Sequence, residues 1–249
     1  MAQWHDAQVV NRIDWNDHLF SLQFSCLDFP KIKAGQFTKV GIEQADGKVL
    51  SRPYSLVNGP DSEILEIIAV PVEEGSLSPK LHHLAVGDSV KIMSPATGFL
   101  ILDEVPKSDT LFLIATGTGV GPFLSILETQ QAWTSYSNVV LVYGVRWSAD
   151  LAYQDKIEQW LKQYPSQFSF VPIVSREKIS GALHGRIPQL IADNQIQQHS
   201  GHMIDVSTSQ VMLCGNPAMI QDSIQVLETF GLKKHLRRSP GQISLERYW

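Results

Sequence analysis

A change of rhythm at "DEVPKSD", residues 103 to 109, is the feature that most constrains the fold. From Gln8 to Ile101, short strand-like runs such as "HLFSLQFS" and "EILEIIAVPV" are separated by turn sequences such as "ADGK" and "VGDS". Short strands at such spacing predict a small antiparallel barrel or sandwich. Only "LSPKLHHLA", residues 77 to 85, is expected to be helical, with Pro79 in its first turn.

After this segment, strand-like and helix-like sequences alternate. The predicted strands are "TLFLIATG", "NVVLVYGVR", "FSFVPIVSR" and "SQVMLCGN"; helices are expected near 121 to 132, over 149 to 163, and after the last two strands. Such alternation predicts a doubly wound parallel sheet. A chain of 249 residues is long enough for two cores. We therefore predict a β plus α/β protein, with an antiparallel Greek-key β-barrel over residues 1 to 102 and a parallel α/β domain over residues 109 to 249.

Composition excludes several classes of protein. The hydrophobic fraction of 43% suits a globular protein with buried cores rather than a disordered chain. The longest apolar runs, "LFLIA" and "VVLVYGV", are far shorter than the roughly 20 residues of a membrane-spanning helix. The N-terminus shows no basic stretch followed by an apolar one, so a cytoplasmic protein without a membrane segment is expected.

The cysteine count limits the possible redox chemistry. Cys26 and Cys214 are the only cysteines, which excludes a disulfide framework, a four-cysteine zinc site and an all-cysteine iron–sulfur cluster. No metal site is predicted. If this chain handles electrons, an organic cofactor must carry them.

A glycine-rich turn follows the strand "LFLIATG". Its glycines, in "TGTGVGP" at 116 to 122, would let the backbone approach a ligand closely, and the following helix would offer its N-terminus to a phosphate. The spacing is G-x-G-x-G rather than G-x-G-x-x-G. The segment is therefore a candidate nucleotide site, and the alternative is simply a tight strand-to-helix turn.

Arginines gather near the carboxyl ends of the next two predicted strands. Arg146 ends one strand, Ser175 and Arg176 end the next, and Arg186 follows soon after. An NAD site would be expected to carry an acidic residue there, whereas guanidinium groups match the oxygens of a 2′-phosphate. This pattern favours NADP over NAD, although each arginine could instead be an ordinary surface residue.

Four motifs identify a family. The chain carries "RPYS" at 52 to 55, "GSLS" at 75 to 78, "ATGTGVGP" at 115 to 122 and "CGNPAM" at 214 to 219, in this order. In this combination they resemble the ferredoxin–NADP reductase family, specifically its bacterial ferredoxin/flavodoxin–NADP reductases, over essentially the whole chain. The resemblance implies that the barrel binds FAD and that the α/β domain binds NADP(H). Without it, "RPYS" could be read as an edge strand with a core tyrosine.

The resemblance implies roles for residues of the barrel. Arg52 is expected to pair with the FAD pyrophosphate, Tyr54 to stack on the isoalloxazine, and Ser55 to hydrogen-bond near flavin N5. "GSLS" would supply a second phosphate loop, and the strand end at 68 to 71 would run beside the adenosine half. The other FAD contacts expected here are Pro53, Ile68, Ala69, Val70, Pro71, Ser76, Leu77 and Ser78.

The resemblance also implies roles in the second domain. Thr118 would sit where flavin and nicotinamide meet, and Cys214 would line the nicotinamide as a contact residue rather than a nucleophile. The expected NADP-binding residues are Val145, Arg146, Ser175, Arg176, Arg186, Cys214, Gly215 and Asp222. The residues expected to act nearest the reacting rings are Ser55, Thr118, Cys214 and Glu246.

Two aromatic residues follow Glu246 in "LERYW". Tyr248 is expected beside the flavin ring and Trp249 beside the adenine, because flat side chains stack well on heterocycles. This placement would explain why residues 67 to 70 contain no aromatic residue to receive the adenine. The resemblance implies that Glu246 holds the position of an acidic residue that related plant enzymes use near the nicotinamide; a solvated carboxylate is the alternative.

The family resemblance implies hydride exchange between NADPH and FAD, followed by single-electron exchange with ferredoxin or flavodoxin. From Gly231 onward there are five Lys or Arg residues against one Glu, although the whole chain has a net charge of −5. An acidic carrier is therefore expected to dock near Lys233, Lys234, Arg237 and Arg238 of "KKHLRR". A solvated charged face is the alternative for this run. A monomer that does not bind nucleic acid is expected.

Three other functions stay open on the sequence. The chain could be an NAD(P)H-dependent flavin or quinone reductase of the same superfamily, or an electron-transfer subunit of a larger complex. It could also be a nucleotide-binding regulator without redox turnover, but this reading leaves "RPYS" unexplained.

Overall fold

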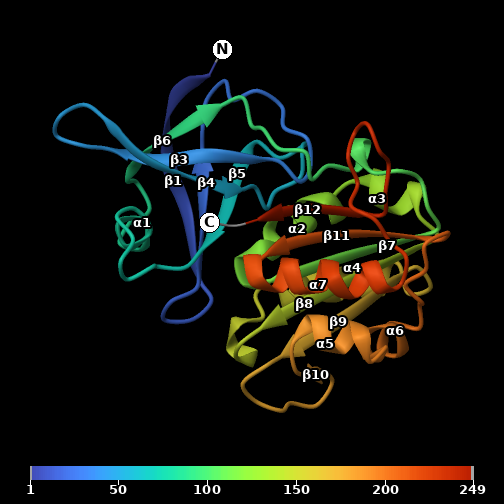
Figure 1. Ribbon diagram of the computed structural model, residues 1–249. Helices are drawn as coiled ribbons and strands as arrows, with labels where there is room; N and C mark the ends of the chain where they lie inside the picture. The colour runs from blue at the N-terminus through green and yellow to red at the C-terminus, as the bar shows by residue number, and fades with distance from the viewer. Residues whose placement is uncertain (1, 248–249) are drawn as a thin grey trace.

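The computed structural model describes residues 2 to 247, and these form two β-sheets with different architecture (Figure 1). The strands of the first sheet are β1 (Gln3–Asp14), β2 (Phe20–Ser25), β3 (Phe37–Glu43), β4 (Val49–Ser55), β5 (Ile64–Ala69) and β6 (Ser89–Ser94). Their order is β4-β3-β6-β1-β2-β5, and every pairing is antiparallel. One short helix, α1 (Ser78–His82), lies between β5 and β6. The first half is therefore an antiparallel half-barrel, in agreement with the antiparallel barrel architecture that the sequence predicts for this half.

The barrel sheet has one buried face and one wetter face. In β1, Ala7 and Val9 are buried while their neighbours are more exposed, which is the alternation expected of a strand with one face on a core. The edge strands β4 and β5 approach each other where the backbone N–H of Val57 donates to the carbonyl of Glu66, at 2.9 Å. This hydrogen bond brings the two edges of the sheet together without continuing the ladder.

The second sheet is parallel throughout. Its strands are β7 (Thr110–Thr116), β8 (Asn138–Val145), β9 (Phe168–Val174), β10 (Leu183–His184), β11 (Ser209–Gly215) and β12 (Ile243–Arg247). Their order is β10-β9-β8-β7-β11-β12. Nearly every residue of β7, β8 and β11 is buried, as expected for strands covered on both faces. This sheet confirms the predicted fold class.

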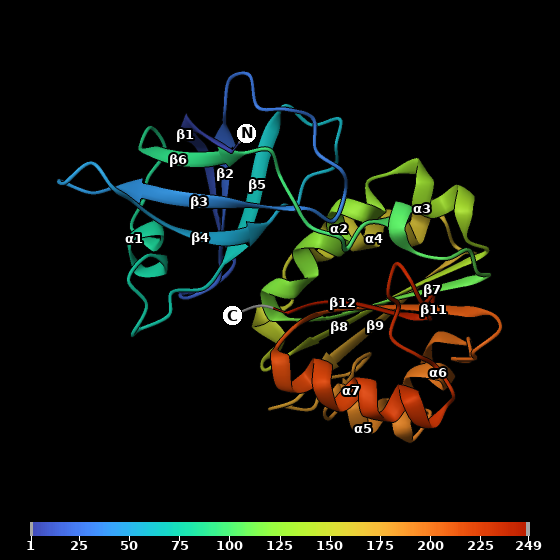
Figure 2. The ribbon, with the colours of Figure 1, turned by 45° about the horizontal axis from the view of Figure 1, so that its top comes forward.

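Helices cover both faces of the parallel sheet. The helices are α2 (Gly121–Leu127), α3 (Gln130–Ser135), α4 (Gln154–Gln163), α5 (Ile187–Ala192), α6 (Gln195–Ser200) and α7 (Pro217–Thr229). Figure 2 shows α2, α3 and α4 on the side of the sheet nearer the barrel, and α5, α6 and α7 on the opposite side. Two separate apolar cores result, one on each face.

The local structure differs from the sequence prediction in several places, including three in the α/β domain. The helix expected near 121 to 132 is two helices, because the chain turns at Glu128 and Thr129 between α2 and α3. The helix expected from 149 starts only at Gln154, after a 3₁₀ turn over Ser148–Asp150 and a residue in the left-handed conformation, Tyr153. The last residues described were expected only as a returning tail, but Ile243–Arg247 forms a strand of the sheet. Among residues 2 to 247, no helix is long and apolar enough to cross a membrane.

Candidate functional site

The parallel sheet has its topological switch point between β7 and β11, because the chain continues from β7 toward β8 and later returns on the other side. Ligands of open α/β sheets bind outside the carboxyl ends of the strands at such a point. Here those ends are Thr116, followed by a 3₁₀ turn over Gly117–Val120, and Cys214 with Gly215. The predicted glycine-rich turn and the predicted nicotinamide contacts are thus brought together.

Backbone atoms meet directly at this switch point. A Cβ atom added at Gly119 would lie 2.7 Å from Cα of Gly215, and one added at Gly215 would lie 2.3 Å from Oγ1 of Thr116. Gly215 also has φ = +124°, which side-chain-bearing residues rarely adopt. The same Thr116 hydroxyl accepts a hydrogen bond from the backbone N–H of Asn216, at 2.9 Å. Two glycines and one threonine therefore fix the ends of β7 and β11 against each other.

The helix after β11 starts with a side-chain cap. Asn216 accepts hydrogen bonds from the N–H groups of Ala218 and Met219, at 2.9 and 3.1 Å, and Pro217 occupies the first turn. This is why "CGNPAM" ends a strand and begins a helix within six residues. Cys214, near the end of β11, and Thr118, within the 3₁₀ turn after β7, are both buried.

The barrel presents the motif "RPYS" on β4, an edge strand. Pro53 is tolerated there because an edge strand has no second neighbour that would need its missing N–H. Arg52 and Pro53 are exposed, Tyr54 is partly buried and Ser55 is only 5% exposed. Burial raises the pKa of the Tyr54 phenol to about 12, so this ring remains neutral at physiological pH.

A side-chain hydrogen bond between Ser55 and Glu246 joins the two halves of the molecule. The Ser55 hydroxyl donates to Oε1 of Glu246 at 3.0 Å, although the two residues are 191 positions apart in the sequence. Strand β12 holds Glu246 opposite Cys214 of β11. Burial raises the pKa of the Glu246 carboxyl to about 7, an effect that the Ser55 hydrogen bond only partly offsets. A proton can therefore reside on this carboxyl near neutral pH.

The expected adenosine and phosphate segments lie next to this region. Ile68 is buried and would contact a Cβ added at Gly121 at 3.6 Å, so β5 packs on the start of α2. The hydroxyl of Ser78 accepts from the N–H of Val72 at 3.0 Å, whereas Ser76 is exposed. The side chains of Ile68, Ala69 and Leu77 are buried, and those of Val70 and Pro71 are partly buried.

The structure brings two of the three predicted arginines together. The N–H of Arg176 donates to the carbonyl of Arg146 at 2.9 Å, and the N–H of Ser175 donates to that of Val145 at 3.1 Å. Both arginine side chains are exposed beyond the carboxyl ends of β8 and β9. Arg186 is also exposed and immediately precedes α5, and Asp222 is exposed on α7.

One residue of the basic run at 233 to 238 already has partners within the protein, which the sequence did not predict. Arg237 pairs with Glu104, with its Nη2 at 2.7 Å from Oε1, and its guanidinium lies over the ring of Phe99 at 4.4 Å from the centroid. This pair lowers the pKa of Glu104, chiefly through the Arg237 hydrogen bonds. Lys233, Lys234 and Arg238 are exposed. Tyr248 and Trp249 lie outside the described residues.

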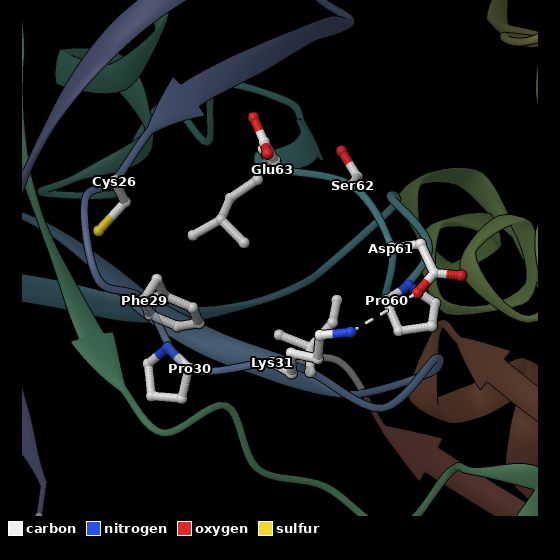
Figure 3. A pocket seen from close by; sticks show the side chains of 10 residues that line it. Cys26, Phe29, Pro30, Lys31, Pro60, Asp61, Ser62 and Glu63 are labelled. Atoms are coloured by element: carbon white, nitrogen blue, oxygen red, sulfur yellow. Dashed lines mark ion pairs between the residues drawn. The ribbon is translucent and has the colours of Figure 1, made fainter.

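A cavity of about 340 Å³ lies elsewhere on the barrel (Figure 3). It is formed by two loops, around 26 to 32 and around 60 to 65, and includes none of the predicted site residues. Cys26 lines it, and burial raises the pKa of this thiol to about 11, so it is protonated at neutral pH. Within residues 2 to 247, no group of His, Cys, Asp or Glu side chains could hold a metal ion.

Several residues that the sequence did not single out join the two halves. Ser125 donates to the carbonyl of Asn58 at 2.6 Å, and Glu128 accepts from the N–H of Gly59. Tyr153 donates to Glu66 at 2.5 Å. Single polar residues in helices and strands carry no sequence signal for such pairing, since their partners are distant in the chain.

An antiparallel half-barrel followed by a doubly wound parallel sheet, with a serine–carboxylate pair between them, defines a class of two-domain oxidoreductases. Residues 113–225 match the model of an oxidoreductase NAD-binding domain. The fold is similar to that of a ferredoxin–NADP⁺ reductase from Neisseria gonorrhoeae solved with bound FAD and NADP. The TM-score is 0.94 and the identity 30%, over 99% of both chains.

Relatives of known name give the family. The chain is 44% identical to a flavodoxin/ferredoxin–NADP reductase of Escherichia coli over the full length of both proteins. It is 32% identical to a ferredoxin–NADP reductase of Pseudomonas aeruginosa, over 99% of this chain and 98% of that protein. The chain therefore belongs to the flavodoxin/ferredoxin–NADP reductase family, as its four motifs predict.

Proposed function

We propose that this enzyme binds FAD on its barrel and NADP(H) at the switch point of its parallel sheet, and that it moves electrons between NADP(H) and ferredoxin or flavodoxin. The observation that carries the proposal is the Ser55–Glu246 hydrogen bond, which joins the barrel motif to the strand beside the switch point. The similarity to named reductases over the whole chain supports it.

The barrel residues fit a flavin with its phosphates. Arg52 is exposed on an edge strand, where its guanidinium can reach a pyrophosphate, and Tyr54 offers a neutral ring for stacking. Ile68 and Leu77 are buried, so contacts with a ligand would come from the backbone of their segments. The exposed Ser76 can offer its hydroxyl. Tyr248 and Trp249 remain proposed contacts to the flavin and the adenine.

The α/β domain fits a nucleotide with an extra phosphate. Arg146 and Arg176 leave adjacent strands side by side, and Arg186 adds a third positive charge nearby in the chain. Within residues 2 to 247, no atom beyond Gly117 and its two chain neighbours lies within 4 Å of the Cβ position at Gly117, so these residues leave room for a ligand at the turn after β7. Gly215 and the buried Cys214 and Thr118 would border the nicotinamide. Val145, Ser175 and Asp222 complete the proposed set.

Bound FAD would supply the step between a hydride donor and a one-electron acceptor. The chain positions the two ring systems and controls one proton. Ser55 directs its O–H at Glu246, and the Glu246 carboxyl, with a pKa near 7, can hold or release a proton at this place. The close approach of Gly119 and Gly215 fixes the two strand ends against each other, and the rings would lie beyond these ends.

The docking surface for the carrier is proposed to include the basic run and two exposed apolar side chains. Phe99 and Leu236 are 68% and 62% exposed, and Lys233, Lys234 and Arg238 surround Leu236 in the chain. An acidic carrier would be steered by the charges and held by the apolar groups. Arg237 contributes as part of its pair with Glu104.

Charge reversal tests this surface. Lys234→Glu with Arg238→Glu should slow carrier reduction at low salt by about tenfold, because rim charges act on association rate. The reduction of a small dye by NADPH should stay unchanged. The control, Lys162→Glu on α4, should affect neither rate. Equal carrier rates for the double variant and the wild type would refute the docking surface.

The absorption spectrum of the purified protein tests the function itself. A flavin spectrum that bleaches with NADPH under anaerobic conditions, and far less readily with NADH, is expected. A colourless protein that gains no flavin spectrum with added FAD would overturn the proposal. Fast reduction of free flavins or quinones, with no preference for ferredoxin or flavodoxin, would support a flavin or quinone reductase instead. Equal reduction by both nucleotides would remove the 2′-phosphate assignment.

The remaining features complete the proposal. Residues 1 to 102 are proposed as the FAD domain and residues 109 to 249 as the NADP(H) domain, with a monomeric enzyme acting in the cytoplasm. Light scattering of the purified protein tests the monomer.

A further inference from the structure

A buried carboxylate lies between the two halves of the molecule. Glu66, on β5, is 6% exposed. Its Oε1 accepts from the hydroxyl of Tyr153 at 2.5 Å, and its Oε2 accepts from Nε2 of Gln23 at 2.9 Å. Removing a carboxylate from water is costly unless its oxygens are satisfied. A tyrosine from the α/β domain therefore provides one of the donors that permit a polar group inside the barrel edge.

A chain of hydrogen bonds leads to Glu66, and each group in it donates to the next one toward Glu66. Because the O–H of Tyr153 is donated to Glu66, its oxygen accepts from the hydroxyl of Ser21, at 2.6 Å. The Ser21 oxygen accepts in turn from Nε1 of Trp15, at 2.9 Å, and the Trp15 and Tyr153 rings lie 4.5 Å apart. Burial and the nearby Glu66 raise the pKa of Tyr153 well above its usual value, so the donor keeps its proton. Chains of this kind are stronger than isolated pairs.

The backbone on the α/β side is held in an unusual conformation. Tyr153 has φ = +60°, a left-handed value that costs free energy for a residue with a side chain. The preceding turn is tied to the barrel as well, since Nδ2 of Asn16 donates to the carbonyl of Ala149 and to Asp150, both at 3.0 Å. The surrounding contacts thus hold the segment from 147 to 153 in one conformation.

The residues bonded to Glu66 and the segment that holds Tyr153 are each close in the chain to a proposed ligand-binding residue. On the barrel side, the Glu66 carbonyl accepts from Val57, and the Glu66 N–H donates to Oδ1 of Asn58 at 2.8 Å. These residues come two and three positions after Ser55. On the other side, the segment from 147 to 153 begins immediately after Arg146. A displacement at Tyr153 would therefore be felt at both sites.

We propose that Tyr153 and Glu66 are positioning residues, whose hydrogen bond across the domain interface fixes the distance and orientation between the flavin-binding edge of the barrel and the nucleotide-binding strand ends. This inference rests on the proposed function for its consequence in catalysis. The hydrogen-bonded network itself is a property of the folded chain.

The decisive variant is Tyr153→Phe, which removes one oxygen and leaves the ring in place. Its matched control is Tyr136→Phe, because Tyr136 is as buried but lies at the end of α3, away from the barrel contacts. Amide hydrogen exchange of the purified protein should become about tenfold faster at Val57, at Glu66 and over residues 149 to 153 in Tyr153→Phe, and remain unchanged there in the control.

Rapid-mixing kinetics of the flavin-loaded enzyme give the second readout. The limiting rate of flavin reduction by NADPH should fall about tenfold in Tyr153→Phe, with the apparent Kd for NADPH changed by less than about twofold, because geometry rather than affinity is altered. This limiting rate should fall less in Glu66→Gln, because the glutamine keeps an acceptor oxygen for Tyr153. If Tyr153→Phe does not fold, Ser21→Ala, which removes the next donor, is expected to produce the same exchange pattern.

Two results would overturn the inference. Hydrogen exchange in Tyr153→Phe that matches Tyr136→Phe would show that the network does not hold the interface. Faster exchange with an unchanged reduction rate would show that it holds the interface without positioning the cofactors. If NADPH did not reduce the flavin of the wild-type protein, this would instead count against the proposed function. The exchange experiment would still test the network.

Discussion

At the switch point, the ends of β7 and β11 meet through backbone atoms, whereas the barrel and the parallel sheet meet through side-chain hydrogen bonds. The first contact needs glycine at 119 and 215, because a methyl group would overlap the opposite strand. The second needs matched donors and acceptors such as Tyr153 with Glu66. Rigidity at the switch point thus comes from steric exclusion, while the orientation between the two domains comes from hydrogen-bond pairing.

The largest expected effect tests the steric side of this comparison. Gly215→Ala should destabilise the protein by about 4 kcal/mol, because the methyl group overlaps Thr116 and φ is positive. Gly201→Ala is the control and should cost about 1 kcal/mol, since φ is also positive there but, among the described residues, only its chain neighbours lie within 4 Å of its Cβ position. Urea unfolding measures both. Equal losses would mean that backbone conformation alone requires glycine at 215.

The next effect is a pH dependence of stability caused by Glu246, which pairs with the switch-point strand β11 and accepts a hydrogen bond from Ser55 of the barrel. Its folded-state pKa of about 7 is above the ordinary value of 4.5, so the folded state binds the extra proton. Its contribution to stability is thus fully present at pH 4.5 and below and is lost as the pH rises through 7, by roughly 2–3 kcal/mol.

Glu246→Gln should remove this pH dependence. Urea unfolding of the flavin-free protein at pH 4.5 and pH 8 measures the loss in the wild type and in the variant. The variant should be relatively more stable at pH 8. Parallel pH profiles for the two proteins would contradict a carboxyl that titrates near 7.

The smallest effect sharpens the hydrogen-bonded side. Glu128→Ala removes the acceptor for the N–H of Gly59 and the partner of Lys156, and should cost roughly 1 kcal/mol. Glu158→Ala on α4 also breaks an ion pair, with Lys162 at 3.7 Å, but this pair is exposed within one helix and should matter by about 0.5 kcal/mol or less. Thermal unfolding compares the two. A larger loss for Glu158→Ala would contradict the importance of the domain interface.

The predictability of the two junctions from sequence follows from their physics. A steric contact requires glycine, and the glycines of "TGTGVGP" and "CGNP" are visible in the sequence. The first segment was therefore singled out as a candidate nucleotide site, and the second through the family resemblance, but their contact with each other was not predicted. The hydrogen-bonded contacts use ordinary residues, and nothing in "LAYQDK" distinguishes Tyr153 from an apolar core residue. The break between α2 and α3 was missed because the polar residues between them, "ETQQ" at 128 to 131, include neither glycine nor proline to mark the end of a helix. Glu246 was expected near the site, but its strand pairing was not, since five residues after a polar loop give too short a pattern.

The Ser55–Glu246 hydrogen bond has a consequence for the order of folding. It joins residues 191 positions apart, so the chain loses the conformational entropy of closing this loop before the hydrogen bond can stabilise the fold. The hairpin of β3 and β4 and the ladder between β7 and β8 can form from neighbouring sequence without it. Folding intermediates can therefore hold both sheets in nearly final form and still lack this pair. A probe placed at Ser55 or Glu246 would report the arrival of the native state rather than the formation of either half.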